Sequence, residues 1–144
     1  MKVKEFMTSQ IQWVTPNDPI QKAAQIMKSV NCGSVPVCEG TKPVGIITDR
    51  DIAIKAVASN KMNANVKECM TNQVITCTSD TDAHEAADLM ATHQIRRLPV
   101  VDASGNLVGI CSIGDLATVD IHVNEAGDAL SRISEQTNAP NALH

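Results

Sequence analysis

The feature that most restricts the fold of this 144-residue chain is an internal duplication. The segment Val3–Thr8 returns 63 residues later as Val66–Thr71, with five of its six residues unchanged. One extra residue in the second copy then brings Gly45 opposite Gly109. Each copy of a duplication is one structural unit that packs on its neighbour. Two copies therefore predict two similar halves that pack on each other about a pseudo-two-fold axis.

Each copy has the same predicted order of elements, β-α-β-β-α, which places the chain in the mixed α/β (α+β) class. In the first copy, Asp18 is predicted to cap a helix that begins at Pro19 and ends near Asn31. A helix over 49–58 follows the last strand. The predicted helical stripes are Ile20, Ala23, Ala24 and Met27 in the first copy and Ala83, Ala86, Ala87 and Met90 in the second. The predicted strands are 34–38, 44–48, 98–101 and 107–112.

The repeat divides the chain into three predicted parts. Residues 1–60 form the first unit, residues 61–121 the second, and residues 122–144 a short helix and a tail. The helix over 124–134 is predicted to bury one side, and the Asn- and Pro-containing stretch 137–144 is predicted to fray. The predicted apolar side of this helix consists of Ala126, Ala129, Leu130 and Ile133.

Composition argues against several classes of function. The net charge is −4, and Phe6 and Trp13 are the only aromatic residues, so a nucleic-acid binder is disfavoured. The start of the chain has no apolar signal region, and no stretch reaches transmembrane length, which indicates a cytoplasmic protein without a membrane partner. The five cysteines are odd in number and form no C-x-x-C pair, so we expect reduced, buried thiols and no metal site.

The duplicated stretches Gly45–Asp51 and Gly109–Asp115 are the candidate binding elements. Each runs from a short apolar strand into a helix, where free N–H groups favour an anion. The Thr48 hydroxyl at this junction suits a phosphate. The Asp51 carboxylate, one helical turn further on, suits the paired hydroxyls of a ribose.

A purely structural alternative fits the same spacing. Thr48 and Asp51, and likewise Ser112 and Asp115, match a capping box, in which both side chains satisfy N–H groups at a helix start. This alternative needs no ligand. Both interpretations can hold together, because a cap in the empty protein can bind phosphate when a ligand arrives.

The two Gly-apolar-x-Thr/Ser-x-x-Asp elements, the preceding Pro36-Val37 and Pro99-Val100, and the β-α-β-β-α order together resemble a tandem pair of cystathionine β-synthase (CBS) domains, of the type that stands alone in bacteria. The resemblance covers roughly residues 1–121. It implies two units packed through their sheets, with clefts that bind AMP, ADP, ATP, S-adenosylmethionine or NAD. It also implies that Asp51 and Asp115 bind ribose, that Thr48 and Ser112 meet phosphate, and that the protein forms homodimers.

The resemblance also assigns charged and apolar neighbours to the ligand. Arg96 and Arg97 precede the second Pro-Val strand, where the family often has a basic residue that reaches phosphate, and guanidinium groups suit this role. Arg50 is a third candidate, and surface ion pairing is the alternative for all three. We expect the Asp115 site to bind phosphate poorly, because it lacks the basic pair. The expected walls for the base are Val14, Thr15, Val35 and Pro36, with core packing as their alternative.

No set of catalytic residues is recognisable, so we expect a regulatory ligand-sensing module and not an enzyme. Asp49 and Asp51 could share a magnesium ion only if they lay on one helix face, and their spacing places them on different faces. The sensor would change its conformation or assembly with an adenine nucleotide, and an unidentified protein partner would respond. The main alternative is a constitutive dimerisation or scaffold module without a nucleotide.

Overall fold

The computed structural model describes residues 1–72, 74–118 and 123–135, and these residues form two compact units. The first-copy unit comprises Gln10–Val74 together with Gly105–Leu107. The second-copy unit comprises Met1–Ser9, Ile75–Ser104 and the chain from Val108 onward. The stretch 137–144, which was predicted to fray, lies outside the described residues.

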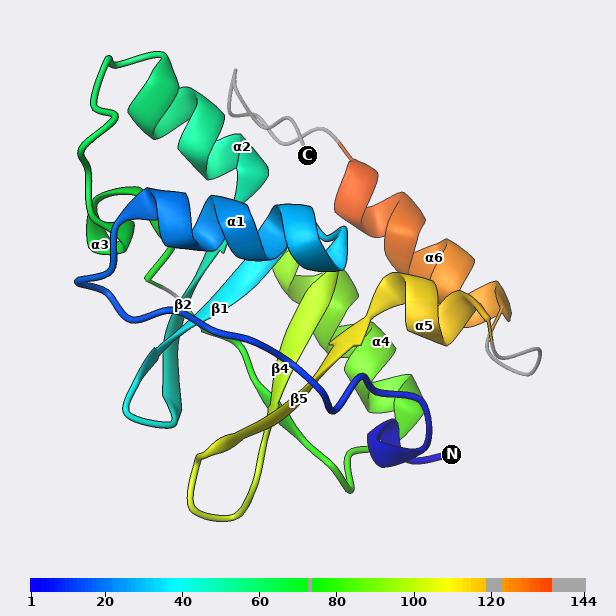
Figure 1. Ribbon diagram of the computed structural model, residues 1–144. Helices are drawn as coiled ribbons and strands as arrows, with labels where there is room; N and C mark the ends of the chain where they lie inside the picture. Colours follow the sequence, from blue (N-terminus) through cyan, green and yellow to red (C-terminus); the bar gives the residue numbers. More distant parts are fainter. Residues whose placement is uncertain (73, 119–122, 136–144) are drawn as a thin grey trace. The chain divides into compact units, whose positions relative to one another are not determined.

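The first-copy unit is built on the hairpin of β1 (Ser34–Glu39) and β2 (Lys42–Thr48), which pair antiparallel. Val14 adds a short parallel pairing beside Val37. Helix α1 (Ile20–Val30) precedes the hairpin and α2 (Asp49–Asp51) follows it (Figure 1). Two further helices complete the unit, the π-helix η2 (Ile52–Val57), which continues α2, and α3 (Val66–Cys69).

The second-copy unit repeats this arrangement around a three-stranded sheet of order β3-β4-β5, in which β3 is parallel to β4. The predicted β-α-β-β-α order and the α+β class are therefore confirmed. The strands are β3 (Cys77–Thr78), β4 (Arg97–Val101) and β5 (Leu107–Ser112). The helices are η1 (Val3–Glu5), α4 (Ala83–His93), α5 (Ile113–Ala117) and α6 (Val123–Ser134).

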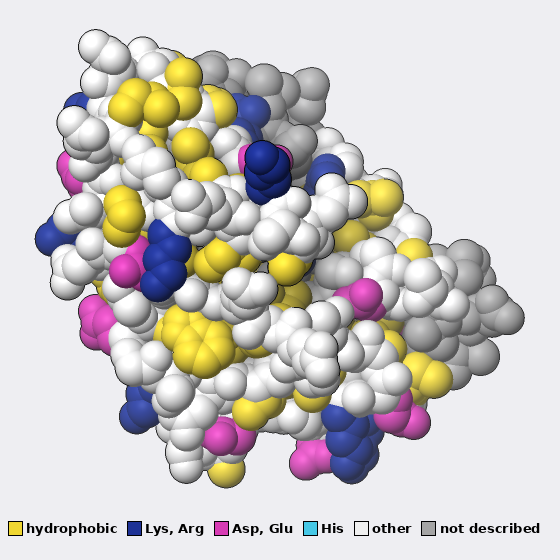
Figure 2. Space-filling model, in the orientation of Figure 1, with side chains coloured by type: hydrophobic (Ala, Val, Ile, Leu, Met, Phe, Trp, Pro, Cys, Tyr) yellow, Lys and Arg dark blue, Asp and Glu magenta, His cyan; other side chains and the backbone are white. Residues whose placement is uncertain are grey.

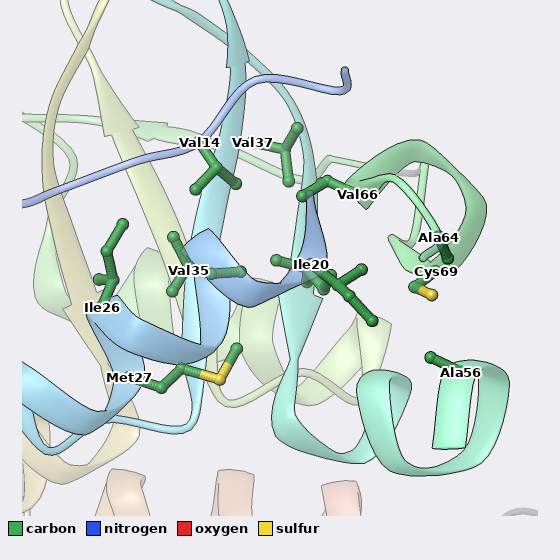
Figure 3. Packing of buried hydrophobic residues seen from close by; sticks show 12 residues of the cluster. Val14, Ile20, Ile26, Met27, Val35, Val37, Ala56, Ala64, Val66 and Cys69 are labelled. Carbon is green, nitrogen blue, oxygen red and sulfur yellow. The ribbon is translucent and has the colours of Figure 1, made fainter. Parts of the chain in front are cut away.

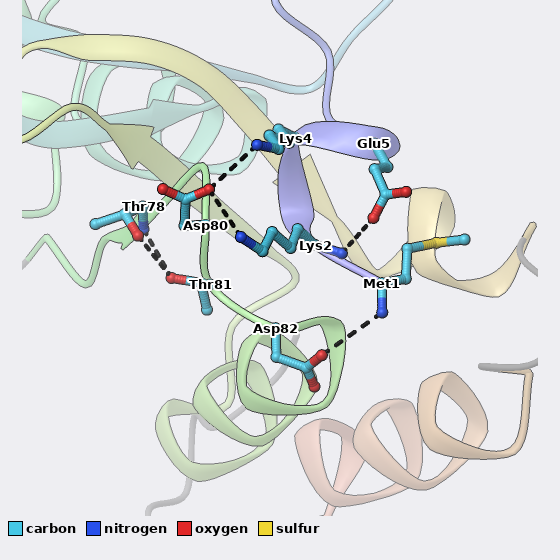
Figure 4. A network of polar contacts seen from close by, with 8 residues as sticks. All are labelled: Met1, Lys2, Lys4, Glu5, Thr78, Asp80, Thr81 and Asp82. Atoms are coloured by element: carbon cyan, nitrogen blue, oxygen red, sulfur yellow. Dashed lines mark hydrogen bonds and ion pairs between the residues drawn. The ribbon is translucent and has the colours of Figure 1, made fainter.

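The two copies exchange their leading segments. The start of the chain belongs to the second-copy unit, where the Val3 N–H donates to the Thr81 carbonyl at 2.9 Å. The side chains of Lys2 and Lys4 both approach Asp80 there, at 3.4 and 3.3 Å (Figure 4). The matching segment that begins with α3 belongs to the first-copy unit. The sequence repeat and the compact unit therefore do not contain the same residues.

Each unit has its own hydrophobic core, built from aliphatic side chains and cysteines. In the first-copy unit, α1, both strands and α3 contribute to one cluster, which also includes Ala56 of η2 (Figure 3). In the second-copy unit, Val3 from the chain start packs with Leu98, Val100 and Met90. The leading segments are therefore part of the cores and are not loose extensions.

Helix α6 completes the second core. It packs against α4 and α5, and its Ile133 is 1% exposed (Figure 1). Its Glu125 also pairs with His84 at the start of α4. The predicted apolar side was correct for Ala126, Ala129 and Ile133 but wrong for Leu130, which is 42% exposed because it lies at the edge of the buried stripe.

Two details of the predicted first helix were wrong. Asp18 does not cap it: the N-cap is Pro19, and the Asp18 carboxylate accepts from the Thr15 N–H at 2.8 Å. Ala24 is exposed, whereas its counterpart Ala87 is buried against Ala126 of α6. Helix α6 therefore explains why these two equivalent alanines differ in their exposure to solvent. The predicted end near Asn31 is confirmed by its left-handed backbone, with φ of 54°.

The five cysteines are free thiols, and the predicted burial is confirmed for all except Cys32, which is half-buried. Burial raises the pKa of Cys77 to about 11 and that of Cys111 to about 12. An unfolded thiol has a pKa of about 8.5, so the unfolded chain loses these protons first as the pH rises. Stability from the neutral thiols is therefore complete below about pH 8 and is lost as the pH rises towards 12.

We expect the free energy of unfolding to fall between about pH 8.5 and about pH 10, because the unfolded state is progressively favoured by thiol ionisation. Urea denaturation across this range, under reducing conditions, measures the effect. A Cys111→Val variant should show a smaller fall than the unmodified protein. Equal slopes of the free energy of unfolding against pH in the two proteins would contradict the assignment of this fall to the Cys111 thiol.

Candidate functional site

The candidate site in the first copy is the junction between β2 and α2. Thr48 is the N-cap, and its hydroxyl accepts from the Asp51 N–H at 3.0 Å. The Asp51 carboxylate reaches back, and its Oδ2 accepts from the Thr48 N–H at 2.9 Å. The capping-box alternative is therefore realised, and it holds both candidate side chains at the helix start.

Lys55 is a third member of this junction. Its ammonium group lies 3.3 Å from Asp51 Oδ1, the oxygen that is not used in the cap. The same Lys55 Nζ donates to the Cys69 carbonyl, at the end of α3, at 3.0 Å. Burial and the Glu68 charge raise the pKa of the Cys69 thiol, while the Lys55 charge acts in the opposite direction. One lysine thus connects the candidate ribose-binding carboxylate to α3.

The junction between β5 and α5 in the second copy has the same cap. The Ser112 hydroxyl accepts from the Asp115 N–H at 3.0 Å, and Asp115 Oδ2 accepts from the Ser112 N–H at 3.0 Å. The lysine has no counterpart, because the equivalent residue in the sequence is Val119. The two junctions therefore share their cap geometry and differ in the charge that faces the carboxylate.

The main chain before each hairpin also approaches its junction. The Gly33 carbonyl accepts from the Asp49 N–H at 2.9 Å, and the Arg96 carbonyl accepts from the Ile113 N–H at 2.9 Å. A Cβ atom at Gly33 would lie 3.1 Å from Asp49 Oδ2. The first copy therefore has a glycine beside an aspartate where the second has an arginine beside an isoleucine.

The three candidate arginines lie in both units. Arg50 and Arg96 are exposed, and Arg97, the first residue of β4, is half-buried. Within residues 1–72, 74–118 and 123–135, no hydrogen bond or ion pair engages any of their guanidinium groups. Their assignment to a phosphate stays a prediction.

The four residues expected to line the base differ in exposure. Val14, Val35 and Pro36 are buried, and both valines belong to the core of the first-copy unit. Thr15 is exposed, and its N–H is taken by Asp18. Core packing is thus realised for the valines, while contact with a ligand stays a prediction for all four.

Sequence reasoning missed Lys55, although a signal was present. Lys55 lies four residues after Asp51, the spacing at which opposite charges pair on a helix.

Among the described residues, no group of three His, Cys, Asp or Glu side chains could hold a metal ion. The expectation of free N–H groups at the helix start was wrong for the first copy, because the N–H groups of Asp49, Arg50 and Asp51 donate to the Gly33 carbonyl, to Asp49 Oδ1 and to the Thr48 hydroxyl. The hydroxyl and the carboxylate at the junction remain suited to hydrogen-bonding a small polar ligand. None of the helices in the described ranges has the length and apolar character that a bilayer crossing requires.

Comparisons with known proteins give a consistent result. The family model of the CBS domain matches residues 3–57 and again residues 66–122. The CBS domain-containing protein YhcV of Bacillus subtilis strain 168 is 44% identical over 135 residues, covering 93% of this chain and 96% of that protein.

Two solved structures extend the likeness to the fold. The CBS domain pair of protein MJ0100, in complex with 5′-methylthioadenosine and S-adenosyl-L-methionine, has a TM-score of 0.75 at 34% identity, covering 83% of this chain and 95% of that one. CBSX2, in complex with AMP, has a TM-score of 0.71 at 26% identity, covering 85% of this chain and 98% of that one.

Proposed function

Because the chain belongs to the CBS-domain family and carries two such domains in tandem, we propose that it is a regulatory module that binds an adenosyl compound. Two similar pairs support this class of ligand, since one was solved with 5′-methylthioadenosine and S-adenosyl-L-methionine and the other with AMP. The observation that carries the proposal is the duplicated cap, which places a hydroxyl and a carboxylate together at a helix start in both copies.

The first copy is the proposed nucleotide site. Asp51 accepts from the ribose hydroxyls, and the Thr48 hydroxyl faces the phosphate. Arg96 and Arg97 are the proposed phosphate partners, with Arg50 as a further cation. AMP, ADP or ATP are thus the preferred candidates there. Asp115 and Ser112 would form the weaker phosphate site and would accept an uncharged adenosyl compound such as 5′-methylthioadenosine.

The proposed mechanism is a population shift and involves no catalysis. A ligand favours whichever conformation or assembly binds it better, and coupling of this kind typically amounts to about 1–3 kcal/mol. The protein would act in the cytoplasm as a homodimer, and a partner protein would respond to the favoured state. This makes the module a candidate sensor of adenylate levels.

The test compares two conservative variants, Asp51→Asn and Asp115→Asn. Each keeps a side-chain oxygen that can accept the N–H bond of the cap, so each loses mainly the charge that ribose hydroxyls would use. Asp51→Asn should weaken AMP binding by about tenfold to a hundredfold, since hydrogen bonds to a charged group contribute about 1.5–3 kcal/mol. Asp115→Asn should leave it nearly unchanged. Calorimetric titration and thermal shift with AMP, ATP, NAD and S-adenosylmethionine provide the measurements.

A scaffold without a nucleotide is the second candidate, and one observation favours it. In both caps the two side chains and the two N–H groups satisfy one another, so the geometry that the junctions share has a structural use of its own. Failure of every adenosyl compound to bind or stabilise the unmodified protein would support the scaffold. Equal loss of binding in the two variants would instead show that the copies contribute alike.

A further inference from the structure

We infer that Lys55 is the positioning residue of the first-copy site, and that it couples ligand binding at Asp51 to the docking of α3. The inference rests on the proposed function and extends it to a residue outside the Thr-x-x-Asp pattern. It also concerns regulation, because it names the segment that responds when the carboxylate is occupied.

The first step is the state of the carboxylate. Its Oδ2 accepts from the Thr48 N–H at 2.9 Å, and its Oδ1 lies 3.3 Å from Lys55 Nζ. The Asp51 side chain is only 14% exposed, whereas that of Lys55 is 45% exposed. A carboxylate held at both oxygens has little rotational freedom, so a ligand does not have to order it on binding. Lys55 thereby completes the orientation that the cap begins.

The second step is the other contact of the lysine. The Cys69 carbonyl is one of the last in α3, where backbone carbonyls have no partner within the helix. Lys55 Nζ donates to it at 3.0 Å, an interaction that cations favour at helix ends. Two residues later, Thr71 and Ile46 exchange backbone hydrogen bonds at 2.9 and 3.1 Å. The end of α3 is therefore fixed to β2 on one side and to Asp51 on the other.

The local helix geometry supports this role. Lys55 lies in η2, where N–H groups bond to carbonyls five residues back, as Ala58 does with Ala53 at 2.9 Å. Wide helical turns of this kind are uncommon and often occur at functional sites. The equivalent residue in the sequence of the second copy is Val119, whose side chain has neither the charge nor the donor that these two contacts need. The coupling is thus a property of the first copy alone.

The third step is linkage. Ribose hydroxyls that donate to Asp51 share the carboxylate with Lys55, so the ligand and the end of α3 interact through one charge pair. If the contact between Lys55 and α3 changes the affinity for the ligand by some factor, ligand binding must change the strength of that contact by the same factor. Docked α3 positions the carboxylate, and a bound ligand should therefore hold α3 more firmly.

The test uses Lys55→Met with Lys22→Met as the matched control. Lys22 also forms an ion pair with the aspartate four residues before it, Asp18, at 3.2 Å in the same unit. Lys55→Met should weaken AMP binding about tenfold, and Lys22→Met less than about twofold. Lys55→Arg, which can make both contacts, should restore most of the affinity. On an Asp51→Asn background, Lys55→Met should have little further effect, because the two residues act as a unit.

Hydrogen exchange of backbone amides provides a second test, because a lysine with a purely structural role would not change how AMP affects the exchange rates. AMP should slow exchange of the Met70 and Thr71 amides in the unmodified protein and in Lys22→Met, but not in Lys55→Met. If AMP binds and Lys55→Met behaves as Lys22→Met does in affinity and exchange, the inference is overturned and the proposed function stands. If none of AMP, ATP, NAD and S-adenosylmethionine binds the unmodified protein, both are overturned.

Discussion

Replacing Gly45 with alanine should lower the free energy of unfolding by about 3 kcal/mol, because an added methyl group has no room in the first-copy unit. A Cβ atom there would lie 2.6 Å from the Thr71 carbonyl oxygen and 3.1 Å from Met70 Sδ. The backbone oxygen can move only if the paired hydrogen bonds between Ile46 and Thr71 are strained. Urea denaturation followed by circular dichroism measures the loss.

Gly127→Ala provides the control for this prediction. No atom lies within 4 Å of a Cβ at Gly127, which is exposed within α6. Alanine is a better helix former than glycine by about 1 kcal/mol, so this variant should be slightly more stable than the unmodified protein. If Gly45→Ala were as stable as Gly127→Ala, the close approach of Thr71 to β2 would be wrong.

Replacing Ile133 with alanine should cost about 3 kcal/mol and identify α6 as a part of the second core. Ile133 is 1% exposed and packs in the cluster that contains Leu98, Val100 and Met90. Its truncation leaves a cavity under α6, and the lost contacts add to the lost hydrophobic burial. Thermal and chemical unfolding both report the change.

Leu130→Ala is the matched variant, since Leu130 lies on the same helix and is 42% exposed. Its cost should stay below about 1 kcal/mol. Similar losses in the two variants would indicate that α6 packs in another orientation. A small loss in both would mean that the helix contributes little to the core.

The repeated pattern was sufficient to predict the elements, because apolar spacing and turn residues act locally. The hairpin strands were placed within two residues of their observed ends, and Asn31 adopts the left-handed conformation that ends α1. The family was also correctly recognised from the Thr-x-x-Asp and Pro-Val elements. The capping geometry at Thr48 and Asp51 followed directly from the three-residue spacing.

What the sequence could not predict depends on contacts between distant segments. Ala24 and Ala87 occupy equivalent places in the repeat, yet only Ala87 is covered, because α6 has no counterpart in the first copy. The hydrogen bond from Lys55 to Cys69 likewise requires α3 to lie beside η2. No local pattern specifies such an approach. The roles of the arginines and the apolar residues at a ligand stay predictions for the same reason.

One apolar surface is not accounted for by either core. Ile54 and Val57 on η2 are 48% and 55% exposed, and Figure 2 shows hydrophobic side chains gathered over this helix. Exposed apolar side chains that gather in one patch can form a surface that contacts another molecule. The homodimer that we propose for the protein gives such a surface a use.

Because the two copies exchange their leading segments, the two units can complete their folding only in a certain order during synthesis on the ribosome. The first-copy unit has all of its large segments once residue 74 has been made, and it can begin to fold while synthesis continues. Residues 1–9, although they emerge first, have to wait until the second copy has been translated. Val3 and Phe6 therefore lack their final neighbours until the second copy has been made, and chaperones would find these apolar side chains accessible in that interval.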